Sequence, residues 1–327
     1  MVFSFTARLR PHSLFNGPQR QTFGREWTKI NASEQTPKKL KTNPDIAAII
    51  DSANALVVNA PIEAATLYAA AMQADPANLT AHNALEHLRA PQAYGRWMHV
   101  NCLIDPRDDI FRFFASHEIA KNPIREYLSD GWRTLSELMV ILETLDKPLI
   151  KMESVLEFAA GFGRFTRHLT RVLPARVTCA DVLPGSIDFL RDQFGVKTML
   201  SAHNPSSMVF PQQFDLVFVL SMFTHLPASR WQPWLRSLAT AVKPGGLLVF
   251  SVCNEPAARE LGLVFDADGT HFIGSSESPS LDAEVYGTMY TTRRFVEEQV
   301  TQAFGRGPSH YFPYAFWVGQ DAVVMRF

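Results

Sequence analysis

The sequence predicts an α/β protein with a doubly wound sheet of seven strands, parallel except for one reversed strand, behind a helical N-terminal region. From Glu153 onward, short β-branched runs alternate with helical segments, which is typical of a parallel sheet covered on both faces. The last two candidate strands, residues 309–316 and 321–327, lie too close together for a crossover helix. We therefore expect them to pair antiparallel.

Length and composition favour one large domain with a smaller one. The chain has 327 residues, of which 46% are apolar, and 31 basic residues balance 32 acidic ones. This balance argues against bulk electrostatic binding to nucleic acid or to an anionic membrane. The longest apolar runs fall well short of the ~20 residues that a membrane helix needs, so we expect no membrane partner.

The three cysteines lie far apart, with no CxxC pair and no His cluster at metal spacing. We therefore expect neither a disulfide framework nor a metal site, and a reducing, cytoplasmic location. Residues 1–43 carry eight Lys or Arg against two Glu. Because this stretch lacks the clear amphipathic periodicity of a transit peptide, it is predicted to be a flexible basic tail.

Residues 44–150 are predicted to be a helical N-terminal region. Residues 62–74 are rich in strong helix formers, and Ala64, Tyr68, Ala71 and Pro76 resemble a single tetratricopeptide-like unit. One such unit cannot bury its own apolar face. We interpret it as a helical cap on the main domain; a docking module for another protein is the alternative, and the region is also a candidate homodimer interface.

Helical, aromatic-rich sequence continues over residues 107–145, from Phe111 to Trp132. These aromatic side chains either pack in the core or line a pocket. Gly131 interrupts the run, which indicates a helix end or a close approach of two segments.

The main domain, residues 151–327, contains the remaining elements. The expected strands are residues 154–158, 176–180, 197–200, 214–220 and 247–252, and the expected helices are residues 165–173, 186–194 and 231–242. The turn at residues 243–246, Lys-Pro-Gly-Gly, is predicted to be a tight reversal that uses the conformational freedom of glycine.

The first strand leads into a glycine-rich turn. Gly161 and Gly163 permit a sharp turn and let a ligand lie against the main chain at the start of a helix. This layout serves dinucleotides and S-adenosylmethionine alike, so the glycines alone do not choose between them.

Three details favour the methyl donor. A dinucleotide fingerprint requires a third Gly or Ala where this chain has Thr166. Glu157, at the ligand-facing end of the strand, would repel a pyrophosphate but suits an ammonium and a sulfonium. With the closing strand pair, the ordered motifs resemble the class I S-adenosylmethionine-dependent methyltransferase family, with its Rossmann-like fold, over about residues 150–327. The Phe-Thr-His-Leu and Gly-Gln-Asp-Ala-Val-Val segments resemble its bacterial small-molecule and glycan branch.

The resemblance implies roles for residues of the turn. Glu157, Ala159, Gly161 and Gly163 would hold the amino-acid part of the donor. Asp181 would take both ribose hydroxyls, and it lies 18 residues past Gly163, near the ~20 expected for a ribose-binding acid.

The resemblance also implies contacts at the later strands. Val182 or Leu183 would pack on the adenine, and Asn204 would contact it. Leu220 and Ser221 would lie beside the methionine moiety and the reacting methyl group. Arg164, which follows the second glycine, is expected to be solvated.

The acceptor site is predicted from side-chain chemistry and loop length. His225 either orients an acceptor or serves as a base, or it is a structural histidine at a helix start. Loops as long as residues 253–292 are usually functional or disordered. We expect Tyr286, Tyr290 and His271 from this segment to line an acceptor pocket with Trp132.

Together these features predict an S-adenosylmethionine-dependent methyltransferase that transfers a methyl group by in-line displacement to an O, N or S atom of a small-molecule acceptor. The product would be S-adenosylhomocysteine, and the chemistry requires no metal. Two alternatives stay open: an NAD-dependent oxidoreductase, and a catalytically inactive methyltransferase-like binding protein.

Overall fold

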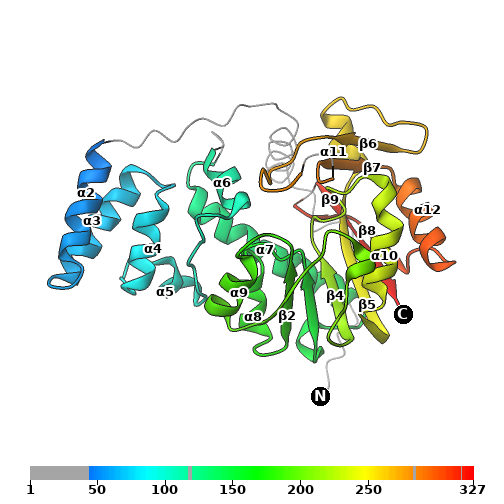
Figure 1. Ribbon diagram of the computed structural model, residues 1–327, viewed down its shortest axis with the longest axis horizontal. Helices are drawn as coiled ribbons and strands as arrows, with labels where there is room; N and C mark the ends of the chain where they lie inside the picture. Colours follow the sequence, from blue (N-terminus) through cyan, green and yellow to red (C-terminus); the bar gives the residue numbers. More distant parts are fainter. Residues whose placement is uncertain (1–43, 117–119, 283–284, 318) are drawn as a thin grey trace, which may run out of the picture.

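A sheet covered by helices and a separate group of N-terminal helices make up the protein (Figure 1). The computed structural model describes residues 44–116, 120–282, 285–317 and 319–327. The basic tail expected at residues 1–43 lies outside the described residues.

Seven strands form the main sheet in the order β3-β2-β1-β4-β5-β9-β8. They are β1 (Val155–Phe158), β2 (Val177–Asp181), β3 (Lys197–Leu200), β4 (Phe214–Val219), β5 (Val242–Cys253), β8 (His310–Phe316) and β9 (Gln320–Arg326). Strands β1 to β5 pair in parallel, whereas β9 runs antiparallel to both β5 and β8. The predicted doubly wound sheet with one reversed strand is therefore confirmed.

A second hairpin enlarges this sheet. Strand β6 (Thr270–Ile273) pairs antiparallel with β7 (Thr288–Thr291), and β7 meets the end of β5 where Tyr290 pairs with Cys253. The sheet of the described residues therefore has nine strands, which corrects the predicted seven. No strand was predicted within residues 253–292, because β6 and β7 are held by pairing with each other and with the end of β5 rather than marked by a local pattern.

Helices cover both faces of the sheet. They are α7 (Pro123–Thr144), α8 (Thr166–Val172), α9 (Ser186–Phe194), α10 (Trp231–Ala239), α11 (Glu255–Glu260) and α12 (Arg293–Phe304), with short 3-10 turns η1 (Leu149–Lys151), η2 (Pro205–Ser207) and η3 (Ala228–Arg230). The tight reversal predicted at residues 243–246 lies inside β5, as an irregularity in its pairing with β4. Gly245 there has φ +77°, so the glycine is needed although the chain does not reverse.

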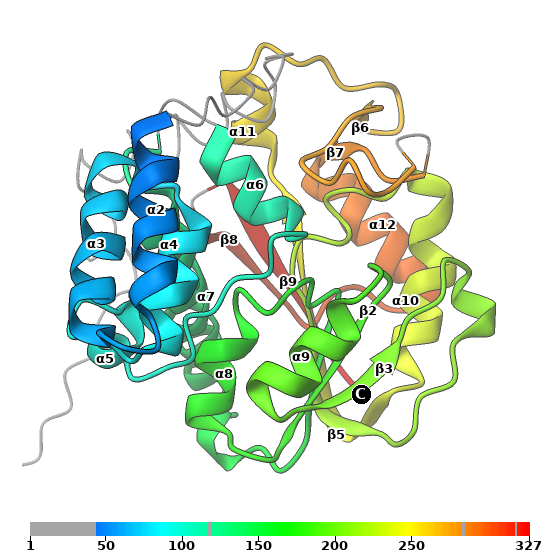
Figure 2. The ribbon, with the colours of Figure 1, turned by 60° about the vertical axis from the view of Figure 1, so that its left-hand side comes forward.

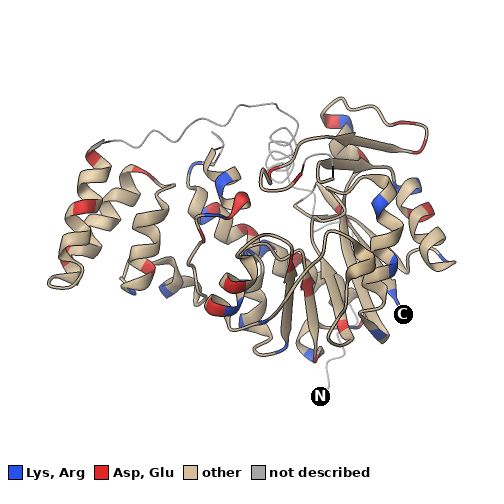
Figure 3. Cartoon of the chain, viewed as in Figure 1, with Lys and Arg blue, Asp and Glu red and all other residues tan. Residues whose placement is uncertain are grey.

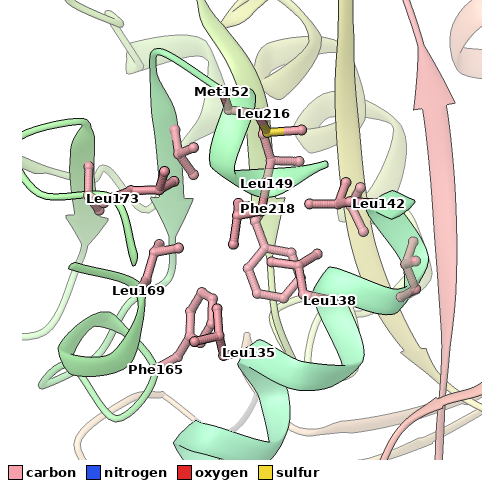
Figure 4. Packing of buried hydrophobic residues seen from close by; sticks show 14 of the residues in the cluster. Leu135, Leu138, Leu142, Leu149, Met152, Phe165, Leu169, Leu173, Leu216 and Phe218 are labelled. Carbon is pink, nitrogen blue, oxygen red and sulfur yellow. The ribbon is translucent and has the colours of Figure 1, made fainter. Parts of the chain in front are cut away.

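Helix α7 contributes its apolar stripe to the core of the sheet. Leu135, Leu138 and Leu142 are buried against Leu216 and Phe218 of β4 (Figure 4). Burying each of these side chains stabilises the fold by roughly 1.5–3 kcal/mol. The helices that cover the sheet thus begin at residue 123, inside residues 44–150, which were predicted to form a separate N-terminal region.

The first helices have a core of their own. Helices α2 (Pro44–Leu56), α3 (Pro61–Ala74) and α4 (Leu79–His87) bury a cluster that includes Ala64, Tyr68 and Ala71. Helix α5 (Tyr94–Met98) follows, and the chain then passes over α8 and α9 to α6 (Asp109–Ser116) (Figure 2). The likeness to a tetratricopeptide unit stays a prediction.

Hydrogen bonds attach the segment between α5 and α6, at residues 101–103, to the helices of the sheet domain. The buried Arg167 side chain donates to the carbonyl oxygens of Asn101 and Leu103 at 3.2 and 3.0 Å, and Asn101 donates to the carbonyl of Gln193 at 2.9 Å. These bonds give partners to the carbonyl oxygens of Asn101, Leu103 and Gln193, whereas one terminal nitrogen of Arg167 has no hydrogen-bond partner among the described residues. The contacts bring residues 105–110 over the carboxyl ends of the strands.

Charged residues of both signs are interspersed over the described elements (Figure 3). Among the described helices, none has both the length and the apolar composition that a membrane crossing requires.

Candidate functional site

A cavity of about 410 Å³ opens at the carboxyl ends of β1, β2 and β4. Strand β1 lies between β2 and β4, so this is the point where the strand order reverses and where open α/β sheets bind ligands. The sheet side of the cavity is formed by residues 158–162, 181–183 and 220–222, and residues 108, 110, 277, 278, 281, 282, 285 and 286 contribute from outside the sheet. The described residues contain no cluster of three or more His, Cys, Asp or Glu suited to a metal ion.

Two non-glycine residues with left-handed backbone follow adjacent strands at this edge. Ala159 after β1 has φ +62° and Ser221 after β4 has φ +61°, and both line the cavity. This conformation costs an L-residue roughly 1–3 kcal/mol and clusters at functional sites. The backbone N–H of Ser221 donates to Ser251 Oγ at 2.8 Å, which holds the turn.

Gly161 leaves open space beside the main chain. It has φ +54°, it lines the cavity, and a Cβ built on it would meet no atom within 4 Å. A ligand can therefore approach the backbone here. Gly163 differs, because its Cβ would lie 2.4 Å from the Phe194 ring. Gly163 does not line the cavity, and its lack of a side chain serves the packing of the turn on α9.

Asp181 connects the glycine turn to the end of β2. Its carboxylate accepts the backbone N–H of Gly161 at 2.6 Å and that of Leu183 at 2.8 Å. The side chain lines the cavity and is 5% exposed, and burial raises its pKa. A carboxylate offers about four lone-pair sites, so two hydrogen bonds leave capacity for a ligand.

Glu157 lies beneath the turn rather than in the cavity. It is buried, and its Oε2 accepts the hydroxyl of Thr166 at 2.7 Å, with the thiol of Cys179 at 3.8 Å. Burial raises the pKa of Glu157 to about 8, so the carboxyl group is mostly protonated at neutral pH. Direct contact with the donor stays a prediction for Glu157 and Gly163.

His225 contacts a carboxylate that lines the cavity. Its Nε2 lies 2.9 Å from Glu277 Oε1, and its Nδ1 lies 2.6 Å from the carbonyl oxygen of Gly287. The ring is buried and stacks on Tyr286 at 4.5 Å between centroids. Burial lowers the pKa of His225, but Glu277 and the carbonyl oxygen of Gly287 together raise it by more, so the net shift is upward.

Arg164 is held inside the protein. Its guanidinium lines the cavity, pairs with the buried Asp130 and lies 4.8 Å from the centre of the Trp317 ring. The expectation of a solvated arginine is wrong. Helix α7 approaches so closely that a Cβ on Gly131 would lie 2.0 Å from the Arg164 carbonyl oxygen, and this approach encloses the side chain.

The predicted contacts at the later strands divide into two groups. Val182, Leu220 and Ser221 line the cavity. Asn204 is exposed and does not line it, because its side chain caps η2 by accepting the backbone N–H of Ser206 at 3.0 Å. Residues 201–203, immediately before it, line the cavity instead.

Only Tyr286 of the four predicted acceptor residues lines the cavity, which corrects the expected joint pocket. Trp132 is 57% exposed because the opposite side of α7 packs on the sheet. His271 and Tyr290 are cross-strand partners in the β6–β7 hairpin. Tyr290 is buried in a cluster with Cys253 and Ala258, away from the cavity.

Sequence reasoning missed Asp108 and Glu277. Asp108 begins α6 by accepting the backbone N–H groups of Ile110 and Phe111, and it accepts the Tyr127 hydroxyl at 2.5 Å. An acid before a helix predicts an N-cap, but nothing in its sequence places it against a cavity. Glu277 has no motif around it; the length of its loop was the only available signal.

Residues 155–246 match the family model described as "Methyltransferase domain". This range holds the glycine turn, Asp181 and the end of β4, and it covers less than a third of the chain. A search of curated proteins finds no match to the chain.

Solved structures with a similar fold include methyltransferases. A S-adenosylmethionine-dependent methyltransferase from Clostridium acetobutylicum is 12% identical, with 58% of this chain and 90% of that chain covered and a TM-score of 0.41. The 1,6-didemethyltoxoflavin-N1-methyltransferase of Burkholderia thailandensis is 17% identical over 62% of this chain and 81% of that chain, with a TM-score of 0.43. The glycopeptide N-methyltransferase MtfA is 16% identical over 60% and 89%, with a TM-score of 0.43.

Proposed function

We propose that the protein transfers a methyl group from S-adenosylmethionine to a small-molecule acceptor. The observation that carries this proposal is the cavity at the carboxyl ends of β1, β2 and β4, within the matched methyltransferase domain, where the open backbone of Gly161 and the carboxylate of Asp181 lie together.

The residues of the cavity fit the donor. The space beside Gly161 admits a ligand against the main chain, Asp181 has hydrogen-bonding capacity for ribose hydroxyls, and Val182, Leu183 and the Phe162 ring are apolar surfaces for adenine. Arg164, the cation that follows the turn, would hold the carboxylate of the donor. When bound, S-adenosylmethionine supplies an already activated methyl group.

The work of the chain is then to position the acceptor and to exclude water. Holding two reactants in line is worth roughly 7–11 kcal/mol in favourable cases. The end of β4, at Leu220 and Ser221, supplies one wall for this purpose, and Glu277 and Tyr286 supply another. Ile110 and Leu281 add apolar lining from outside the sheet, and such lining favours the exclusion of water.

The two alternatives have less support. The domain match favours a methyltransferase over an NAD-dependent oxidoreductase. The position of the dinucleotide fingerprint's third glycine holds Thr166, whose hydroxyl is committed to Glu157. An inactive binding protein would not need two left-handed non-glycine residues, Ala159 and Ser221, at its cavity.

Calorimetry with S-adenosylhomocysteine and, separately, NAD tests the proposal. We expect the first to bind and the second not to bind. A second experiment supplies methyl-labelled S-adenosylmethionine and a metabolite extract, and identifies labelled products by mass spectrometry. Binding of NAD without binding of S-adenosylhomocysteine would overturn the proposed function.

A further inference from the structure

Glu277 is a buried carboxylate at the cavity to which the proposed donor contacts assign no role. It lies in the loop between β6 and β7 and lines the cavity with a side chain that is 14% exposed. A carboxylate in such a position costs free energy unless it is paired or serves a ligand. His225 pairs with one of its oxygens, Oε1.

The contacts of His225 define the state of this pair. Its Nδ1 faces the carbonyl oxygen of Gly287, which can only accept, so Nδ1 carries a hydrogen. Its Nε2 faces the carboxylate, so Nε2 donates as well. With both nitrogens protonated, the ring has no lone pair with which to take a proton from an acceptor. His225 is therefore a positioning residue that acts through Glu277, and the stacked ring of Tyr286 supports its orientation.

An ionised carboxylate accepts hydrogen bonds and cannot donate them, so a ligand that contacts Glu277 must present an N–H or O–H group. The cavity is also lined by Asp108, Asp181 and Asp282, and Asp108 is committed to Tyr127 and the start of α6. Of the two arginines that line it, Arg164 pairs with Asp130 and is assigned to the donor carboxylate in the proposed function, and Arg230 donates to the carbonyl oxygen of His203. This distribution disfavours an anionic acceptor and favours one with amine character.

We propose that the methyl acceptor is an amine and that Glu277, held by His225, binds its N–H group. This inference rests on the proposed methyltransferase function. Accepting one N–H hydrogen bond orients the nitrogen of the neutral amine and leaves its lone pair free. That lone pair would form the bond to the methyl carbon as the carbon–sulfur bond of the donor breaks, and the product ammonium would release its extra proton to water. Glu277 thereby determines which acceptors are used, and it takes no part in donor binding.

The test uses the full chain, tritium-labelled S-adenosylmethionine and a panel of small primary and secondary amines, each matched with the alcohol of the same carbon skeleton. We expect label in amines. For the best amine, Glu277→Gln should lower kcat/KM at least tenfold, mainly through KM, and should weaken binding of that amine to the S-adenosylhomocysteine complex. The Kd of S-adenosylhomocysteine should stay within twofold of the wild-type value.

Glu298→Gln, the same chemical change at an exposed position of α12 outside this cavity, is the matched control and should behave as wild type. If Glu277→Gln does not fold, Glu277→Asp keeps the charge and should show the same effect on KM. Label in alcohols alone, in no amine, or an unchanged KM in the variants would overturn the inference. The Kd of S-adenosylhomocysteine for the wild-type protein is a separate measurement. If the wild-type protein does not bind it, the proposed function itself is overturned.

Discussion

The imidazole of His225 lies between Glu277 Oε1, 2.9 Å from its Nε2, and the carbonyl oxygen of Gly287, 2.6 Å from its Nδ1. The pair joins the loop after β4 to the loop between β6 and β7, 52 residues apart in sequence. Glu277 lines the cavity, whereas His225 does not.

The first prediction concerns the protonation of His225. Burial opposes the charge of both groups. The attraction between them nevertheless lowers the pKa of Glu277 and raises that of His225. The groups around the pair are Tyr286, Arg164 and Cys253. In NMR spectra, His225 should remain doubly protonated above pH 6.5. In Glu277→Gln, burial dominates and the pKa of His225 should fall below 6.5. A neutral ring at pH 6 in the wild type would contradict the ion pair.

The second prediction concerns Asp181. Replacing it with asparagine keeps its size but removes one acceptor, because the amide group cannot accept the N–H groups of both Gly161 and Leu183. We expect S-adenosylhomocysteine to bind more weakly by about 1–3 kcal/mol, measured by calorimetry. Asp188→Asn on α9, where the side chain is 70% exposed, is the control. Equal affinities of the two variants would mean that the ribose lies elsewhere.

The third prediction separates backbone strain from ligand space. Gly161→Ala and Gly245→Ala both place a Cβ at positive φ with no protein atom within 4 Å. Each should lose about 1–2 kcal/mol of unfolding free energy from the left-handed backbone. Only Gly161 lines the cavity, so only Gly161→Ala should lose binding of S-adenosylhomocysteine, by tenfold or more. Denaturant titration and calorimetry on both variants provide the comparison; matching affinities would count against a donor beside Gly161.

The fourth prediction is a pH dependence of stability that comes from Glu157. Burial raises its pKa to about 8 in the folded protein, from 4.5 in the unfolded chain. Between these values the folded state binds more protons than the unfolded one, so stability should fall as pH rises from about 5 to 8. Each pKa unit of separation is worth about 1.4 kcal/mol.

Glu157→Gln keeps an oxygen for the Thr166 hydroxyl and removes the titration. The difference in unfolding free energy between this variant and the wild type, measured in urea, should therefore grow in favour of the variant across that range. A difference that is the same at pH 5 and pH 8 would show that Glu157 titrates normally.

Much of the sheet was predictable because its signals are local. Strands β1, β2 and β4 are short buried runs, and periodicity and turn residues place such runs without knowledge of their neighbours. The β6–β7 hairpin was missed because its strands gain their stability from each other and from the end of β5. The role of α7 was also missed, because an apolar stripe does not reveal which surface it will cover.

The sequence by itself determined the part of the cavity at the strand ends. Ala159, Gly161, Asp181 and Ser221 end or follow strands whose carboxyl ends must meet at one edge of a parallel sheet, so reading the strands was enough to bring these residues together. The part of the cavity that lies outside the sheet was decided only by the tertiary structure. Trp132 was excluded by packing on the other side of its helix, and Glu277 was brought to His225 by loop conformation. No periodic pattern encodes such long-range contacts between loops, because they depend on packing and charge pairing in the folded chain.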